Sequence, residues 1–107
     1  MGVWLDKPWR ALDALPSLPG HMGVFELADD HGTVIYVGYA GGRSRFGLRG
    51  EIQAAADRFR GATRFRYEVT TAYLTRYQEL LMAHRARAGA LPRGNSEVHG
   101  LGRLSPM

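Results

Sequence analysis

The sequence predicts an α+β domain in which a small, mainly antiparallel three-stranded sheet is flanked by helices. Two short apolar segments, residues 22–28 and 33–39, lie one tight turn apart and form a predicted hairpin. The apolar spacing then changes to a helical period, returns to strict alternation and becomes helical again. The predicted order is therefore β-β-α-β-α, which is typical of helices packed on a sheet. At 107 residues, numbered 1–107, the chain is expected to form a single domain.

Residues 1–20 are expected to be an N-terminal lead-in. Asp6 is suited to capping a short helix, and Pro8 is tolerated in the first turn of such a helix. The Pro19-Gly20 pair is a strong stop signal. We therefore predict a short helix that docks on the body of the domain.

The remaining elements follow from periodicity and from turn residues. Apolar residues at helical spacing predict a helix over residues 48–60. Alternation of apolar and charged residues predicts a half-buried strand over residues 63–70. A second helix is predicted over residues 71–88, and Gly89 lies just beyond its end. Residues 96–107, rich in Gly and Pro like the segment before them, are expected to be irregular.

The composition is basic and lacks cysteine. The formal net charge is +4, and Lys7 is the single lysine among 14 basic residues. An arginine-rich basic surface attracts nucleic acid through bidentate phosphate contacts and counterion release. Codon bias in a GC-rich genome explains the arginine content equally well. Without cysteine, disulfides and thiolate metal sites are excluded. We see no signal peptide and no membrane span, so the expected compartment is the cytoplasm.

Several residues fall in an order that carries chemistry. They are Gly23-Val24-Phe25 and Tyr36-Val37-Gly38 on the two hairpin strands, Arg49 in the first turn of the next helix, Glu79 in the last helix, and Asn95 after a proline-containing loop. In this order they resemble the GIY-YIG nuclease superfamily, and in particular the N-terminal nuclease domain of bacterial nucleotide-excision-repair endonucleases. The resemblance covers residues 15–95.

The resemblance implies an endonuclease that hydrolyses DNA phosphodiester bonds with a single Mg²⁺ or Mn²⁺. Glu79 is then the metal ligand, since a hard cation needs only one or two carboxylates from the protein. Tyr36 orients or deprotonates the attacking water. Arg49 stabilises the charge on the phosphate, with Arg45 as the rival because the glycine loop leaves the alignment open. Asn95 holds local structure or a phosphate.

Other residues are candidates for contacts with nucleic acid along the same surface. They are Arg43 and Arg45 in the loop after the hairpin, Tyr39 at the end of its second strand, and Arg64 and Arg66 on the third strand. The four histidines, His21, His31, His84 and His99, have no metal-ligand spacing and are predicted to lie at the surface.

The chain departs from the family pattern at Phe25, where the family usually has tyrosine. The phenylalanine lacks the phenol that is a leading candidate for the general base, and loss of a general base typically costs on the order of 10²–10⁴-fold in rate. Three hypotheses therefore stand. The chain is a metal-dependent nuclease, a non-catalytic nucleic-acid-binding module, or a protein-interaction domain that exposes Trp4 and Trp9. A small domain has little surface for sequence readout, so selective action implies a homodimer or a targeting partner protein.

Overall fold

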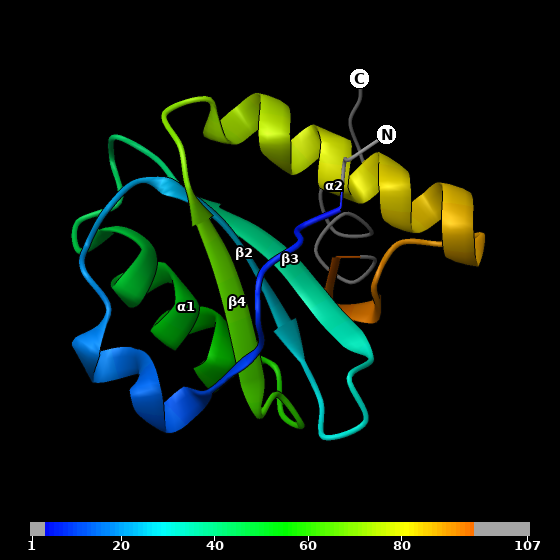
Figure 1. Ribbon diagram of the computed structural model, residues 1–107, viewed down its shortest axis with the longest axis horizontal. Helices are drawn as coiled ribbons and strands as arrows, with labels where there is room; N and C mark the ends of the chain where they lie inside the picture. Colours follow the sequence, from blue (N-terminus) through cyan, green and yellow to red (C-terminus); the bar gives the residue numbers. More distant parts are fainter. Residues whose placement is uncertain (1–3, 96–107) are drawn as a thin grey trace.

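The centre of the fold is strand β2 (Gly23–Ala28), which is buried at every position. The computed structural model describes residues 4–95 and pairs β2 antiparallel with β3 (Val34–Ala40) on one side and with β4 (Arg64–Val69) on the other. Helices α1 and α2 lie on opposite faces of this sheet (Figure 1). The predicted α+β class is confirmed, and the three long strands start and end within a residue or so of their predicted limits.

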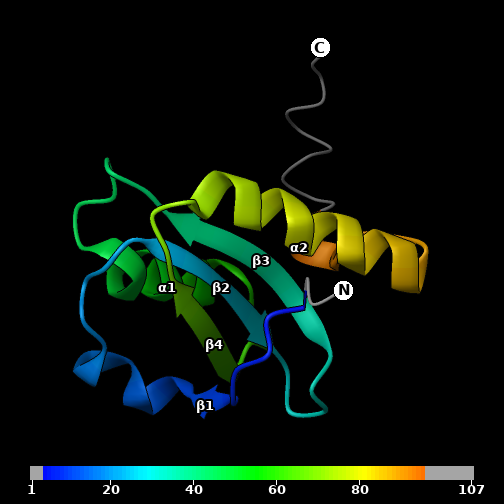
Figure 2. The same ribbon diagram turned by 45° about the horizontal axis from the view of Figure 1, so that its top comes forward.

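The sheet has four strands, and the predicted count of three is wrong. A two-residue strand, β1 (Arg10–Ala11), pairs antiparallel with β4, so the strand order is β1-β4-β2-β3. Figure 2 shows β1 beside β4 at the edge of the sheet. A pairing this short carries no periodicity, and sequence patterns do not reveal it. It partly covers the edge of β4, which would otherwise present unpaired backbone groups.

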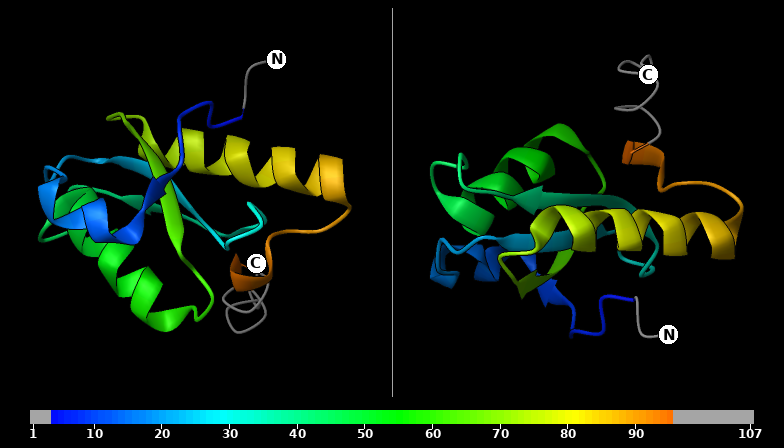
Figure 3. Two further views of the ribbon diagram at one scale, coloured as in Figure 1. Left: turned by 60° about the horizontal axis from the view of Figure 1, so that its bottom comes forward. Right: turned by 90° about the horizontal axis from the view of Figure 1, so that it is seen from above.

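Each helix seals one face of the sheet, as Figure 3 shows from above. Helix α1 (Gly47–Arg58) covers a core that includes Phe25, Leu27 and Phe65. Helix α2 (Tyr73–Ala88) covers a second, smaller core on the other face. The buried residues of this second core are Leu5, Val24, Val37, Leu80 and Leu81.

The lead-in does not form the predicted helix capped by Asp6. The chain instead runs through β1 into a 3-10 helix, η1 (Leu12–Ser17). The reason is that Leu5 packs in the core under α2, whereas Leu15 packs in the core under α1. The chain between them must cross the sheet edge, and an extended chain spans about 3.3 Å per residue against about 1.5 Å in a helix.

The hairpin turn forms as predicted. Asp29 Oδ1 accepts hydrogen bonds from the backbone N–H groups of His31 and Thr33, at 2.9 and 3.0 Å. Gly32 has a φ of +83°, a conformation that other residues adopt only at a cost. The turn, together with a register shift between Leu27 and Ala28, brings Tyr36 opposite Leu27.

A buried carboxylate lies at the middle of the sheet. Glu26 on β2 is 0% exposed and forms an ion pair with Arg66 of β4 at 2.8 Å. The Nε2 atom of His84 on α2 lies 2.9 Å from the other carboxylate oxygen. The prediction that His84 lies at the surface is therefore wrong. A buried charge is tolerated only when it is paired and hydrogen-bonded, and these two partners meet that need.

The outer edge of β3 is closed by a side chain. Asn95 is buried, its Nδ2 donates to the carbonyl oxygen of Val37, and its Oδ1 accepts from the Val37 N–H, both at 2.8 Å. The side-chain amide thus takes the place of a neighbouring strand at one position of an open edge. Of the two roles predicted for Asn95, the structure assigns it the local structural one.

Within residues 4–95, neither helix has the length and apolar character needed to cross a bilayer. The tail predicted over residues 96–107, and His99 within it, lie outside the described residues.

We predict that Asn95→Ala lowers the free energy of unfolding by about 1–3 kcal/mol, because two hydrogen bonds are lost and a cavity forms beside β3. Urea denaturation measures the change. Gln78→Ala, which truncates an exposed amide on α2, is the control and leaves the midpoint close to that of the parent. Equal midpoints for the two variants would contradict the edge-closing role.

Candidate functional site

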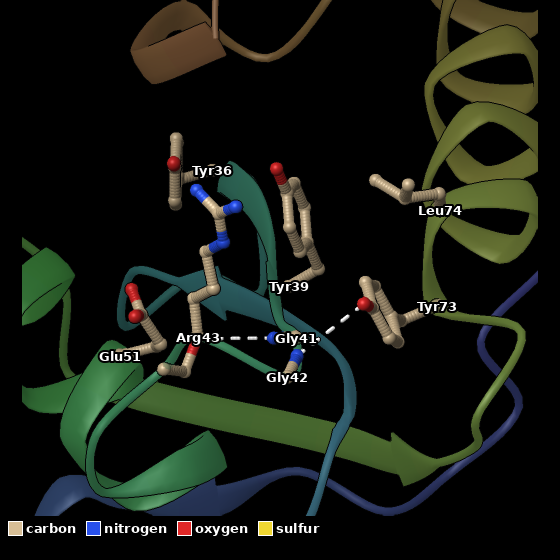
Figure 4. Close-up of a pocket in the computed structure, with 9 residues that line it drawn as sticks. Tyr36, Tyr39, Gly41, Gly42, Arg43, Glu51, Tyr73 and Leu74 are labelled. Carbon is tan, nitrogen blue, oxygen red and sulfur yellow. Dashed lines mark hydrogen bonds between the residues drawn. The ribbon is translucent and has the colours of Figure 1, made fainter.

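A groove lies where β3 ends, between α1 and the first turn of α2 (Figure 4). Its volume is about 540 Å³, within the range of small-molecule sites. We call it the tyrosine cleft. It is lined by Tyr36, Tyr39, Gly41, Gly42, Arg43, Ser44, Glu51, Tyr73 and Leu74. A smaller adjoining hollow of about 120 Å³ shares Tyr36, Tyr39 and Glu51 with it and is also lined by Phe25, Ala54, Ala55, Arg58 and Phe59, and we include it in the tyrosine cleft as its inner end.

Tyrosines form one wall of the cleft. The ring of Tyr39 is stacked on that of Tyr73, with centroids 5.7 Å apart and an interplanar angle of 16°. Tyr77 meets Tyr39 edge-on, with centroids 5.0 Å apart. Tyr39 remains 39% exposed, so the cleft carries a solvent-accessible aromatic surface on a rigid support. Such a surface suits a flat apolar ligand.

The loop after β3 is shaped by two glycines. A Cβ at Gly41 would lie 2.7 Å from the ring of Tyr73, so the ring seats directly on the backbone there. The Gly41 N–H donates to Ser44 Oγ at 3.0 Å, and the Gly42 N–H donates to the Tyr73 hydroxyl at 3.3 Å. The loop and α2 are thereby joined, which holds the side chain of Arg43 at the mouth of the cleft.

Charged groups of both signs surround Tyr36. Glu51 and Arg58 lie two turns apart on α1, on the face that looks into the cleft. Burial raises the pKa of the Tyr36 phenol above its usual value, while Arg58 lowers that pKa and Glu51 raises it. The net direction shows that burial disfavours the ionised form of this phenol.

Three of the four residues predicted for catalysis do not line the cleft, and one of these is Asn95 at the edge of β3. Arg49 is in the first turn of α1 as predicted, but its Nη1 donates to the carbonyl oxygen of Leu18 at 3.3 Å. The side chain of Glu79 is 45% exposed and pairs with Arg76 one turn earlier on α2, at 3.3 Å. Arg76 in turn pairs with Glu68 on β4, so Glu79 lies on the side of α2 that faces away from β3.

The predicted nucleic-acid-binding residues are divided between two surfaces. Tyr39 and Arg43 line the tyrosine cleft. Arg45 is exposed in the same loop, with its guanidinium 5.8 Å from the centre of the Phe46 ring. Arg64 and Arg66 are on β4, where Arg66 is engaged with Glu26.

The tryptophans are not freely exposed. The guanidinium of Arg66 lies 4.2 Å from the ring centre of Trp9, and that of Arg87 lies 4.8 Å from the ring centre of Trp4. Both tryptophans are half-buried. The prediction of two exposed anchors for a partner protein is therefore wrong.

Sequence reasoning missed Glu51, Arg58 and Tyr73 as lining residues. A usable signal was present on α1, because positions 51 and 58 share one face and lie beside the buried positions 52, 55 and 59. Tyr73 had no such signal, since its place depends on how α2 lies across the sheet.

The residue predicted to hold a metal is Glu79. Glu79 is occupied by Arg76 and lies apart from Tyr36. Among residues 4–95, no three His, Cys, Asp or Glu side chains gather into a group that could hold a metal ion. Glu51 is the carboxylate that the cleft itself contains.

The fold and the cleft define a small α+β domain with an aromatic and arginine-lined groove. A family model described as a domain of unknown function (DUF7508) matches residues 3–87, and the chain belongs to this family. No curated protein and no solved structure is significantly similar to the chain.

A pH dependence of stability follows from Tyr77. Burial, with a smaller effect of the Tyr36 phenol, raises the pKa of Tyr77 to about 12 from a model-peptide value of 10.0. The folded state keeps this proton between those two values while the unfolded chain loses it, so stability falls as pH rises through this window. We predict that the urea midpoint drops less between pH 10 and pH 12 in Tyr77→Phe than in the parent. Parallel pH profiles would show that Tyr77 titrates alike in both states.

Proposed function

We propose that this domain binds nucleic acid through the tyrosine cleft, as a non-catalytic module. The observation that carries the proposal is the presence of an exposed, supported tyrosine ring and two arginines in one groove. Tyr39 offers the ring, and Arg43 and Arg58 line the same groove. Proteins that bind single strands combine a basic groove with aromatic side chains on which bases stack.

The charges in the cleft favour this ligand. Among residues 4–95, no ion pair engages Arg43 or Arg58, and the Arg58 guanidinium lies 5.5 Å from the Phe59 ring centre. Unpaired guanidinium groups at a groove are suited to phosphate, which they bind bidentately. The formal net charge of +4 adds a favourable long-range term. The motif order that resembles GIY-YIG nucleases also supports a nucleic-acid ligand.

A metal-dependent endonuclease of the GIY-YIG type is the second candidate. The observation in its favour is that Tyr36 and Glu51 line one cleft together with Arg43 and Arg58. Glu51, rather than Glu79, would then hold the Mg²⁺ ion. We rank this candidate second because Phe25 provides no phenol, and because Glu79, the predicted metal ligand, pairs with Arg76 and does not line the cleft.

The size of the cleft bears on selectivity. A groove of about 540 Å³ has room for roughly one nucleotide, whereas specific protein–DNA interfaces bury on the order of 1,000 Å² or more. Selection of a particular site would therefore require a second copy of the domain or a targeting partner protein.

The binding proposal predicts salt-dependent affinity for a fluorescein-labelled single-stranded 12-mer, followed by anisotropy. Arg43→Gln and Arg58→Gln each weaken binding several-fold and each lower the salt slope by about 0.7, as loss of one phosphate contact would. Arg85→Gln, an exposed arginine in the last turn of α2, is the control and changes neither quantity by as much. Equal effects at all three positions would mean that charge alone, and not the cleft, attracts the strand.

The nuclease candidate is tested with supercoiled plasmid and labelled branched DNA, in Mg²⁺, Mn²⁺ and EDTA. Glu51→Ala is expected to abolish any metal-dependent nicking, whereas Glu79→Ala retains it. Phe25→Tyr, which restores the phenol, is the third variant and is expected to raise the rate. No nicking by the parent or by Phe25→Tyr leaves binding as the function of the cleft, and nicking lost only in Glu79→Ala would contradict the role given to Glu51.

A further inference from the structure

The exposed part of the Tyr39 ring defines where a base can lie. The Tyr73 ring stacks on this ring and the Tyr77 ring meets it at an angle of 63°, which leaves Tyr39 39% exposed. The exposed part of Tyr39 lies in the cleft with Arg43, Tyr36 and Glu51 (Figure 4). A base that stacks on the exposed part of the ring therefore has its edges among polar groups rather than in solvent.

The hydrogen-bonding capacity of Glu51 determines which edge of a base fits the cleft. Glu51 is the carboxylate that lines the cleft, and among residues 4–95 no hydrogen bond or ion pair engages it. An ionised carboxylate is an acceptor only, so it repels phosphate and seeks N–H donors. Arg43 and Arg58 are donors only, and they are suited to bind the phosphate. Glu51 shares one hollow with Arg43 and the adjoining hollow with Arg58, so an acceptor for N–H groups and donors for an anion line the same cleft.

Guanine is the base that matches a carboxylate best. Its Watson–Crick edge presents two adjacent donors, N1–H and the 2-amino group, which two carboxylate oxygens accept together. Adenine and cytosine present a single amino group beside a ring-nitrogen acceptor, and thymine presents one N–H between two carbonyl oxygens. In a duplex this edge is engaged by the paired base, so the nucleotide must be unpaired.

We infer that the tyrosine cleft holds one unpaired guanine nucleotide, with the base stacked on Tyr39, its Watson–Crick edge on Glu51 and a neighbouring phosphate on Arg43. This inference rests on the proposed nucleic-acid binding and names the ligand of that same cleft. A bidentate carboxylate contact gives a discrimination of about 5-fold to 100-fold against the other bases.

The test measures the affinity of the full chain for labelled single-stranded 11-mers of thymidine with one central variable base. The central bases are guanine, hypoxanthine, adenine, cytosine and thymine, and a duplex form of the guanine strand is included. We expect the guanine strand to bind at least about 5-fold more tightly than the thymine strand. Hypoxanthine, which lacks the 2-amino group, loses most of this gain, and so does the duplex. The same series in RNA shows whether the cleft accepts both sugars.

Variants assign the preference to its residues. Glu51→Gln is expected to bring the guanine-to-thymine affinity ratio close to one, because an amide offers one acceptor and opposes one donor. Glu79→Gln, on the outer side of α2, is the matched control and keeps the parent ratio. Tyr39→Leu weakens binding to every strand. Circular dichroism and thermal unfolding establish that each variant is folded.

The outcomes separate the inference from the function on which it rests. A ratio of one in the parent, or a ratio that Glu51→Gln leaves unchanged, overturns the guanine assignment while binding to the strands persists. Failure of the parent to bind any strand at low salt overturns both.

Discussion

The burial of β2 on both faces is the constraint on which the rest of the structure depends. Every residue of this central strand is buried, and one of them is Glu26. An unpaired carboxylate at such a position would be too costly to keep ionised, so neighbouring elements must provide partners for it. Arg66 comes from the neighbouring strand and His84 from α2. The packing of α2 on the sheet therefore includes one specific polar contact within an otherwise apolar interface.

That contact fixes how α2 lies along the sheet, and through it the geometry of the tyrosine cleft. Tyr73 is about three helical turns before His84 on the same helix. Once His84 is held at Glu26, a shift of α2 by one turn would move Tyr73 by about 5.4 Å and separate it from Tyr39 and from the loop at Gly41. The buried charge at one end of the helix thus positions an exposed aromatic surface at the other end, although the two sites share no residue.

The sequence was sufficient to predict the hairpin, both helices and the third strand, because each has a clear period and ends at glycine or at turn residues. It did not reveal β1, whose pairing depends on where Leu5 and Leu15 find their cores. For the candidate site, the spacing of residues showed which helix or strand carries each one, but not which side of each helix faces the sheet. Tyr36 lies in the cleft as expected from its strand. Glu79 does not lie in the cleft, because the direction of its side chain depends on which face of α2 packs against the sheet.

Phe25 and Tyr39 give the cleft an aromatic surface at its inner end and at its mouth. Phe25 fills the inner end of the cleft with carbon, and a Cβ on the facing Gly38 would lie 2.4 Å from its ring. Tyr39 adds an exposed ring at the mouth of the cleft. Hydrolysis needs a group that accepts a proton from water, whereas binding needs only fixed donors, an acceptor and a stacking surface. The cleft combines these binding groups, and for this reason we favour recognition over cleavage.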